Sequence, residues 1–196
     1  MVFINRAIGE IQCKIVYFGP GLSGKTTNLE VVHEKAPDDA KGELTSIATE
    51  SDRTLFFDFM PLNLGTVGGM KTKFQLYTVP GQVYYNSTRK LVLRGADGVI
   101  FVADSTPEKM AENLESLDNL EECLREQGKD LKDFAHVIQF NKRDMPGALP
   151  VAEMQRQLNR YGAPCFEAVA YKGDGVIETF KGLSSVVIAK VKGMAE

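Results

Sequence analysis

The sequence contains very little cysteine, and this scarcity limits the kinds of fold and site that it can form. Its 196 residues include three cysteines, Cys13, Cys123 and Cys165, which lie far apart and lack C-x-x-C spacing. Disulfide-stabilised proteins carry more cysteine, and zinc sites need ligands at short, paired spacing. We therefore expect neither a disulfide framework nor a zinc site, and we expect the cysteines to be small buried hydrophobic residues in a reducing cytosol.

The sequence also lacks long hydrophobic runs and an excess of positive charge. No stretch approaches the roughly 20 apolar residues of a membrane-spanning helix. The net charge of −3 gives no electrostatic reason to expect nucleic acid or an acidic membrane as a partner. The amino terminus does not resemble a signal peptide, Val2 stands where myristoylation requires glycine, and the last residues offer no cysteine for prenylation. We expect a cytoplasmic protein without a membrane anchor of its own, so that partners would have to recruit it to any membrane.

The length and the order of hydrophobic segments predict one α/β domain over residues 1–196. Strand-like and helix-like segments alternate from residue 10 onward, which is typical of a wound sheet with helices on both faces. Residues 71–77 alternate polar and apolar side chains, which predicts one antiparallel edge strand in a mostly parallel sheet, after a turn-rich connection over 63–69. The expected strands are 10–18, 55–60, 71–77, 98–104, 136–140 and 165–170, and the expected helices are 26–33, 87–93, a long amphipathic helix from Pro107, 151–160 and 175–192.

One glycine-rich stretch, between the first expected strand and the first expected helix, fits the phosphate-binding pattern G-x-x-x-x-G-K-[S/T] without a mismatch. Glycines let backbone N–H groups turn inward around phosphates, and the helix N-terminus adds partial positive charge. Lys25 would offset the charge of the β- and γ-phosphates, and the Thr26 hydroxyl would ligate Mg²⁺. A glycine-rich turn that matches by chance is the alternative, and the flanking strand and helix disfavour it. The expected contacts are Gly19, Pro20, Gly21, Leu22, Ser23, Gly24, Lys25, Thr26 and Thr27.

Two weaker segments also follow expected strands, where ligands bind in wound α/β folds. In the Pro-Gly-Gln segment, Gly81 could offer its N–H to a γ-phosphate and Gln82 could orient an attacking water. In the later segment, the N–H of Ala170 could meet the O6 atom of guanine, with Val169 and Tyr171 beside it. Taken alone, each segment is also typical of an ordinary turn.

The segment from Asn141 to Asp144 is more specific. The Asp144 carboxylate can accept hydrogen bonds from both N–H groups on the Watson–Crick edge of guanine, where adenine presents a different pattern. Lys142 can lay its aliphatic stem over the purine, and Asn141 can tie this loop to the phosphate loop. N-K-x-D alone is often a solvated turn, but after a phosphate loop and at the end of a strand it favours guanine over adenine.

Together, the segments G-x-x-x-x-G-K-T, P-G-Q, N-K-R-D and E-A-V-A resemble those of Ras-type small GTPases, over nearly the whole chain. More narrowly, residues 17–29, 53–59 and 76–85 are similar to the MglA family of bacterial Ras-like small GTPases, which set cell polarity and gliding motility. The resemblance implies a Ras-like P-loop domain that binds GTP and GDP with Mg²⁺ and hydrolyses GTP slowly unless it is stimulated. It also implies polarity or motility effectors in the GTP state, recruitment to a cell pole, and a Roadblock-domain dimer, MglB, as the activating partner. We expect the chain itself to be a monomer.

The resemblance is weaker around the metal and the switch. Ras-type proteins begin the P-G-Q segment with an aspartate that holds a Mg²⁺-bound water, and this chain has Thr78 there, so its metal affinity or outer shell is expected to differ. Thr45, Thr49 and Thr54 are all candidates for the second metal-binding threonine. We choose Thr54, because it immediately precedes the second expected strand and matches the MglA pattern. The resemblance also implies that Arg53 is an arginine finger in the same chain, moved into place when the partner docks; the alternative is an exposed loop arginine.

Two other functions are compatible with the same motifs. A GTP-dependent binding module that hydrolyses poorly would act as a scaffold. Thr78 favours that reading slightly, whereas Gln82 and Arg53 argue against it. A P-loop ATPase or small-molecule kinase is the third reading, and the N-K-R-D segment argues against it.

Overall fold

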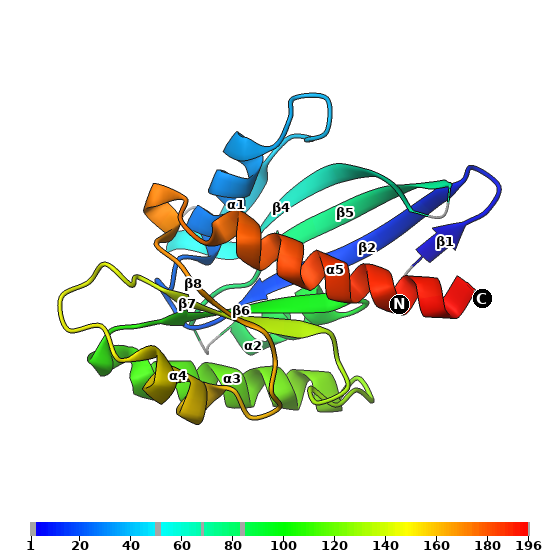
Figure 1. Cartoon of the computed structure of the whole chain (residues 1–196). Helices are drawn as coiled ribbons and strands as arrows, with labels where there is room; N and C mark the ends of the chain where they lie inside the picture. The colour runs from blue at the N-terminus through cyan, green and yellow to red at the C-terminus, as the bar shows by residue number, and fades with distance from the viewer. Residues whose placement is uncertain (1–2, 50–51, 68, 83–84, 196) are drawn as a thin grey trace.

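The computed structural model describes residues 3–49, 52–67, 69–82 and 85–195. In these residues eight strands form one sheet in the order β3-β4-β5-β2-β6-β7-β8, with β1 paired to β2 (Figure 1). Strands β5, β2, β6, β7 and β8 are parallel to one another, which confirms the predicted α/β fold. Antiparallel pairs are more numerous than expected, because β1 and β3 add to the predicted hairpin of β4 and β5. The strands are β1 (Phe3–Asn5), β2 (Glu10–Phe18), β3 (Thr45–Thr49), β4 (Asp52–Val67), β5 (Met70–Thr78), β6 (Gly98–Asp104), β7 (His136–Asn141) and β8 (Cys165–Glu167).

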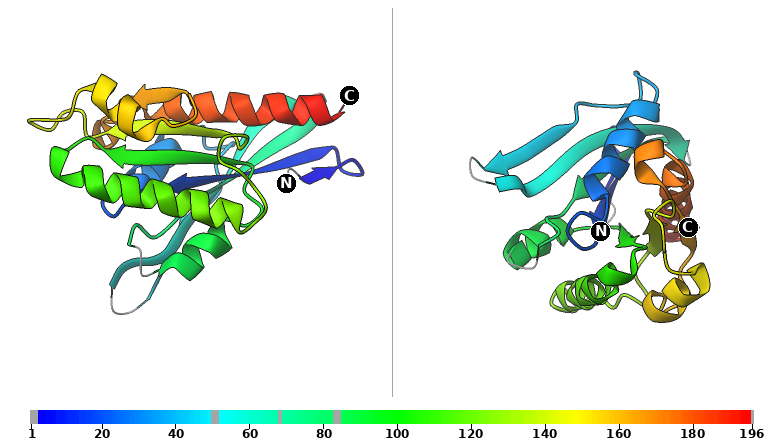
Figure 2. Two further views of the ribbon diagram at one scale, coloured as in Figure 1. Left: turned by 90° about the horizontal axis from the view of Figure 1, so that it is seen from below. Right: turned by 90° about the vertical axis from the view of Figure 1, so that its left-hand side faces the viewer.

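Helices cover both faces of the sheet. Side chains of α1 and α5 pack on one face, and side chains of α2, α3 and α4 pack on the other. Figure 2 shows these helices on the two sides of the sheet. The helices are α1 (Lys25–Lys35), α2 (Asn86–Leu93), α3 (Met110–Arg125), α4 (Val151–Leu158) and α5 (Val176–Ala195), with short 3₁₀ turns η2 (Pro107–Lys109) and η3 (Ala170–Lys172).

The central strands are apolar on both faces because both faces are covered. In β2, Ile15 and Tyr17 pack toward α1 and α5, whereas Val16 and Phe18 pack toward α2 and α3. All seven residues of β6 are buried. Side chains alternate across a strand, so a continuous apolar run is the expected pattern for a strand buried on both sides. These buried strands fix the ends from which the loops of the candidate site emerge.

The hairpin of β4 and β5 is longer than predicted. Residues 63–67 belong to β4, so the prediction of a turn-rich connection over 63–69 is wrong for most of that stretch. The strand accommodates Gly65, at φ 68°, through a shift in register between Asn63 and Thr66. A bulge thus absorbs residues that usually form turns.

The final strand and the long helix also differ in detail from prediction. β8 ends at Glu167, and Ala170 lies in η3 rather than in the strand predicted over 165–170. The helix expected from Pro107 begins as the 3₁₀ turn η2, and α3 follows from Met110. The predicted amphipathic character of this helix is confirmed: Met110, Leu117, Leu120 and Leu124 are buried, and Leu114 is partly buried.

The cysteines behave as the composition suggests. Cys13 and Cys123 are buried, Cys165 is partly buried, and all three are free. Burial raises the pKa of Cys13 to about 12 and that of Cys123 to about 11, so both are inert thiols at neutral pH.

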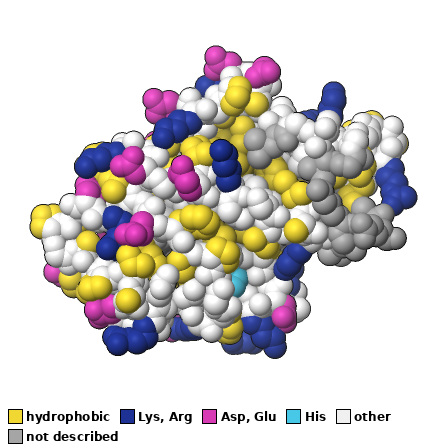
Figure 3. All heavy atoms as spheres, viewed as in Figure 1, with side chains coloured by type: hydrophobic (Ala, Val, Ile, Leu, Met, Phe, Trp, Pro, Cys, Tyr) yellow, Lys and Arg dark blue, Asp and Glu magenta, His cyan; other side chains and the backbone are white. Residues whose placement is uncertain are grey.

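The surface and the helices show two further properties. Charged side chains of both signs are interspersed with hydrophobic ones on the face shown in Figure 3, in keeping with the small net charge. Over the ranges that the structure describes, no helix combines the length and the hydrophobicity that crossing a bilayer requires.

Candidate functional site

The glycine-rich loop lies between the end of β2 at Phe18 and the start of α1 at Lys25, as predicted. Gly19 and Gly24 have φ values of 145° and 101°, which residues with a side chain rarely adopt. A Cβ on Gly24 would collide with Nδ2 of Asn141. Glycine at position 24 therefore allows the loop to turn into the helix and to approach the strand end of β7.

Replacing Gly24 with alanine is expected to lower the free energy of unfolding by about 1–3 kcal/mol, because an unfavourable φ adds to the collision with Asn141. Gly21→Ala is the matched control, since no heavy atom beyond its chain neighbours lies within 4 Å of the added Cβ. Urea unfolding of both variants measures the difference. Equal losses of stability in the two variants would contradict this role for Gly24.

The Lys25 side chain is buried inside the loop. Its Nζ donates to the carbonyl oxygens of Gly19 at 3.1 Å and Pro20 at 2.6 Å. Burial, helped by the positive charge of Arg89, lowers the pKa of Lys25 to about 7, and Asp58 opposes that shift. An anion in the loop would favour the charged form of this lysine.

Nucleotide binding above about pH 7 is therefore expected to be accompanied by proton uptake at Lys25. Phosphate oxygens would raise the pKa of Lys25 above its value in the empty loop, so affinity should fall as pH rises between those two pKa values. Calorimetric titration with GDP at about pH 8, in buffers of different ionisation enthalpy, measures the uptake, because the phosphates themselves are deprotonated there. Binding without proton uptake at that pH would contradict the prediction.

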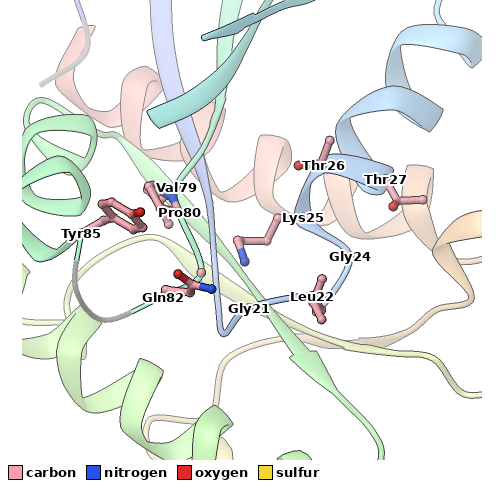
Figure 4. A pocket seen from close by; sticks show the side chains of 11 residues that line it. Gly21, Leu22, Gly24, Lys25, Thr26, Thr27, Val79, Pro80, Gln82 and Tyr85 are labelled. Atoms are coloured by element: carbon pink, nitrogen blue, oxygen red, sulfur yellow. The ribbon is translucent and has the colours of Figure 1, made fainter. Parts of the chain in front are cut away.

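A cavity of about 500 Å³ lies over the loop. It joins the phosphate loop to the turn after β5, and Figure 4 shows Lys25 pointing from the start of α1 toward the turn that carries Gln82. The lining residues are Gly21, Leu22, Gly24, Lys25, Thr26, Thr27, Val79, Pro80, Gly81, Gln82 and Tyr85. Two of the segments predicted from the sequence thus form one hollow.

The Pro-Gly turn packs directly on the phosphate loop. A Cβ on Gly81 would lie 2.5 Å from the backbone nitrogen of Gly21 and 2.8 Å from the carbonyl carbon of Pro20. These are backbone atoms that cannot move aside as a flexible side chain can. Only glycine fits at position 81 in this arrangement, which places its peptide group next to the phosphate loop.

Arg89 of α2 holds this turn, and sequence reasoning missed it. Its side chain is fully buried; Nε donates to the Pro80 carbonyl at 2.8 Å, and Nη2 donates to the Gly81 carbonyl. Nη1 donates to Oδ1 of Asn119 on α3 at 2.8 Å, and the guanidinium lies 5.1 Å from the ring centroid of Phe18. The only signal in the sequence was its position, three residues before buried Val92 on the same helix face.

Asn141 connects the phosphate loop with the loop after β8. Its Nδ2 donates to the Ser23 carbonyl at 2.8 Å, as predicted, and its Oδ1 accepts from the Ala170 N–H at 2.9 Å. This N–H, which we predicted to meet guanine O6, thus donates to Asn141 in this structure, and its contact with guanine stays a prediction. The next N–H along the chain belongs to Tyr171.

The other base-loop candidates surround Asp144. Oδ2 of Asp144 accepts from the Tyr171 hydroxyl at 2.8 Å and lies 3.9 Å from Nζ of Lys172. Lys142, at φ 63°, directs its Nζ to buried Asp104 at 2.6 Å. Val169 was expected beside the base, but its N–H donates to the Asp174 carbonyl within the loop.

The two switch residues are placed differently from the prediction. Thr54 was expected just before a strand and Arg53 in the preceding loop, but β4 begins at Asp52 and includes both. Their side chains fall outside the part of the chain that the structure describes.

A carboxylate that sequence reasoning missed lies beside Thr26. Asp58 of β4 is 1% exposed, and its Oδ2 accepts from the hydroxyls of Thr26 at 2.7 Å and Thr78 at 2.8 Å. Its Oδ1 accepts from the Ser46 hydroxyl at 2.7 Å, and its backbone N–H donates to Oγ1 of Thr78 at 2.9 Å. The signal in the sequence was a charged residue in an apolar strand, two positions before buried Met60 and therefore on the same face of that strand.

Comparison with known proteins agrees with this geometry. Residues 2–187 match the model of the ADP-ribosylation factor family. The chain is 55% identical over 192 residues to the mutual gliding-motility protein MglA of Myxococcus xanthus (strain DK1622), covering 98% of each chain. It is 28% identical over 185 residues to ADP-ribosylation factor-like protein 6 of Caenorhabditis briggsae, covering 92% of this chain and 89% of that one. It is also 28% identical over 127 residues to the Ras-related protein SEC4 of Saccharomyces cerevisiae (strain ATCC 204508 / S288c), covering 64% and 56%. The chain belongs to the ADP-ribosylation factor family of small GTPases and is a homologue of MglA.

Proposed function

We propose that this chain is a molecular switch that binds GTP and GDP with Mg²⁺, hydrolyses GTP, and controls cell polarity or gliding motility through partners that recognise one nucleotide state. The observation that carries the proposal is the Asn141 amide, which bonds to Ser23 in the phosphate loop and to Ala170 in the base loop. One side chain would thus hold the two halves of a nucleotide site together. A purine at one loop and phosphates at the other would belong to a single ligand.

The phosphate half would use charge and position rather than a covalent intermediate. Lys25 would offset negative charge, the Gly81 N–H would approach the γ-phosphate, and Gln82 would orient the attacking water. The hydroxyls of Thr26 and Thr54 would hold Mg²⁺, which when bound neutralises charge on the phosphates. Hydroxyl oxygens beside a buried carboxylate, as found at Thr26, are donors that suit this hard cation.

The base half would select guanine. Asp144 would accept from the two N–H groups of the guanine edge, and the stem of Lys142 would lie over the ring. We assign the donor to O6 to the Tyr171 N–H, because the Ala170 N–H is held by Asn141.

Slow hydrolysis should become fast when a partner orders the loops and brings Arg53 to the phosphates. The partner that suits this role is a Roadblock-domain dimer like MglB, and the name of the 55% identical relative supports a part in gliding motility. We propose a monomeric single domain over residues 1–196 that is cytoplasmic and is brought to a cell pole by its partners.

The test is multiple-turnover phosphate release from GTP and from ATP, with and without a Roadblock-domain dimer. GTP-specific release that the dimer accelerates is expected. Poor release under both conditions, with partner binding in the GTP state retained, would instead identify a GTP-dependent scaffold. Capture of the same partners by GDP-loaded and GTP-analogue-loaded protein would contradict the switch.

A further inference from the structure

The most unusual ionisable group outside the assigned residues is Asp58. It is almost completely buried, and three hydroxyls from three different elements donate to its two oxygens: Thr26 of α1, Ser46 of β3 and Thr78 of β5. Among the described residues, no lysine, arginine or histidine forms an ion pair with it. The charge of Asp58 acts on Lys25, but the two form no ion pair. Burying a carboxylate without a paired cation is costly, so this arrangement favours a further cation beside it.

The position of Asp58 identifies the kind of cation. Thr26 is the phosphate-loop residue whose hydroxyl suits Mg²⁺, and its Oγ1 lies 2.7 Å from Oδ2 of Asp58. A hydroxyl has one proton and two lone pairs. Because the proton points to Asp58, the lone pairs of Thr26 remain for a cation, and the carboxylate adds negative charge beside it.

The neighbouring strand explains why the carboxylate is on β4. Thr78 occupies the β5 position where Ras-type sequences have an aspartate, and its hydroxyl bonds to both the backbone N–H and Oδ2 of Asp58. The two strands are antiparallel partners, with Phe59 opposite Tyr77, so Asp58 and Thr78 meet at the end of the pair. A carboxylate on β4 thus lies beside the β5 position at which Ras-type sequences have one, and Thr78 is hydrogen-bonded to it.

We propose that Asp58 supplies the carboxylate of the Mg²⁺ site in place of an aspartate at position 78, and that Thr78 is the positioning residue that orients it. This proposal rests on the Mg²⁺-dependent nucleotide binding proposed above. A purely structural role, in which Asp58 only ties β3, β5 and α1 together, is the competing explanation.

The test is the release of a fluorescent GDP analogue as a function of free Mg²⁺. Asp58→Asn keeps the shape of the side chain but removes its charge, and it is expected to raise the Mg²⁺ concentration at half-effect by about 10- to 100-fold. The readout is the shift of this midpoint on the Mg²⁺ axis, measured against each protein's own release rate in the absence of Mg²⁺. Thr78→Ala should shift the midpoint in the same direction by less, and exposed Asp39→Asn should not shift it.

The exchange variant Asp58→Thr/Thr78→Asp provides the second readout. It returns the carboxylate to β5 and is expected to recover most of the Mg²⁺ dependence that Asp58→Asn loses. Faster release by Asp58→Asn to the same extent at every Mg²⁺ concentration would overturn the proposal in favour of the structural role. If Asp58→Asn fails to fold, the exchange variant decides. The proposal is overturned if that variant has a Mg²⁺ midpoint unlike that of the wild type, or if it also fails to fold. Release from the wild type that does not respond to Mg²⁺ would instead refute the Mg²⁺ use proposed above.

Discussion

Replacing Arg53 with alanine is expected to reduce partner-stimulated GTP hydrolysis by about 10³- to 10⁵-fold, the usual contribution of an arginine finger. The guanidinium would offset negative charge that develops on the γ-phosphoryl group in the transition state. In bound GTP, before the reaction, that additional charge is absent. Nucleotide affinity and unstimulated hydrolysis should therefore change little. Single-turnover hydrolysis with a saturating Roadblock-domain dimer measures the effect.

Two further variants separate this role from a general loss of partner binding. Arg53→Lys keeps a positive charge but loses the planar fork that matches phosphate oxygens, so it should recover only part of the rate. Arg125→Ala, an exposed arginine at the end of α3, should behave like the wild type. Full stimulation of Arg53→Ala at saturating partner would show that the finger is absent or comes from elsewhere.

The second large effect is expected at the base. Asp144→Asn should abolish most of the preference for GTP over ATP, because a site built to pair specific N–H groups discriminates by about 10⁴- to 10⁵-fold. An asparagine amide presents one donor and one acceptor, which matches the edge of xanthine, with its extra carbonyl, better than that of guanine. The variant should therefore gain affinity for xanthosine diphosphate. Competition of GDP, ADP and xanthosine diphosphate against a fluorescent nucleotide measures all three affinities.

Exposed Asp130→Asn is the control for this exchange, since its carboxylate accepts from the Lys132 backbone in a loop between α3 and β7. It should keep the guanine preference. An unchanged preference in Asp144→Asn would favour the reading of the chain as a P-loop ATPase or small-molecule kinase, and it would remove the basis for the guanine assignment.

The parts of the site that depend on local sequence were predictable. The glycine pattern at Gly19 and Gly24 fixes a loop between a strand and a helix, and the structure has that loop. The tie from Asn141 to the phosphate loop was also predicted, because both segments leave the same edge of a parallel sheet. Hydrophobic runs identified the central strands for the same local reason.

The parts that depend on partners distant in sequence were not predictable. The contacts of Asp58 with Thr78 and Thr26 form only because β4 lies beside β5, a pairing that places residues distant in the sequence side by side. From the sequence, Arg89 is a typical surface residue of a short helix. Its burial depends on the carbonyl oxygens of Pro80 and Gly81, to which it donates. The bond from the Ala170 N–H to Asn141 was not predicted either, because local sequence does not show which backbone amide a distant side chain accepts from.

Lys25 and Arg89 place two basic groups in the interior around the phosphate loop, and both bond chiefly to carbonyl oxygens. A nucleotide would add negative charge beside these two basic groups. Any ligand that binds only the folded state stabilises it, by about 4 kcal/mol at a thousand times its dissociation constant. The lifetime of this protein in a cell would then follow the supply of guanine nucleotides. A fall in that supply would raise the unfolded fraction on which proteases act.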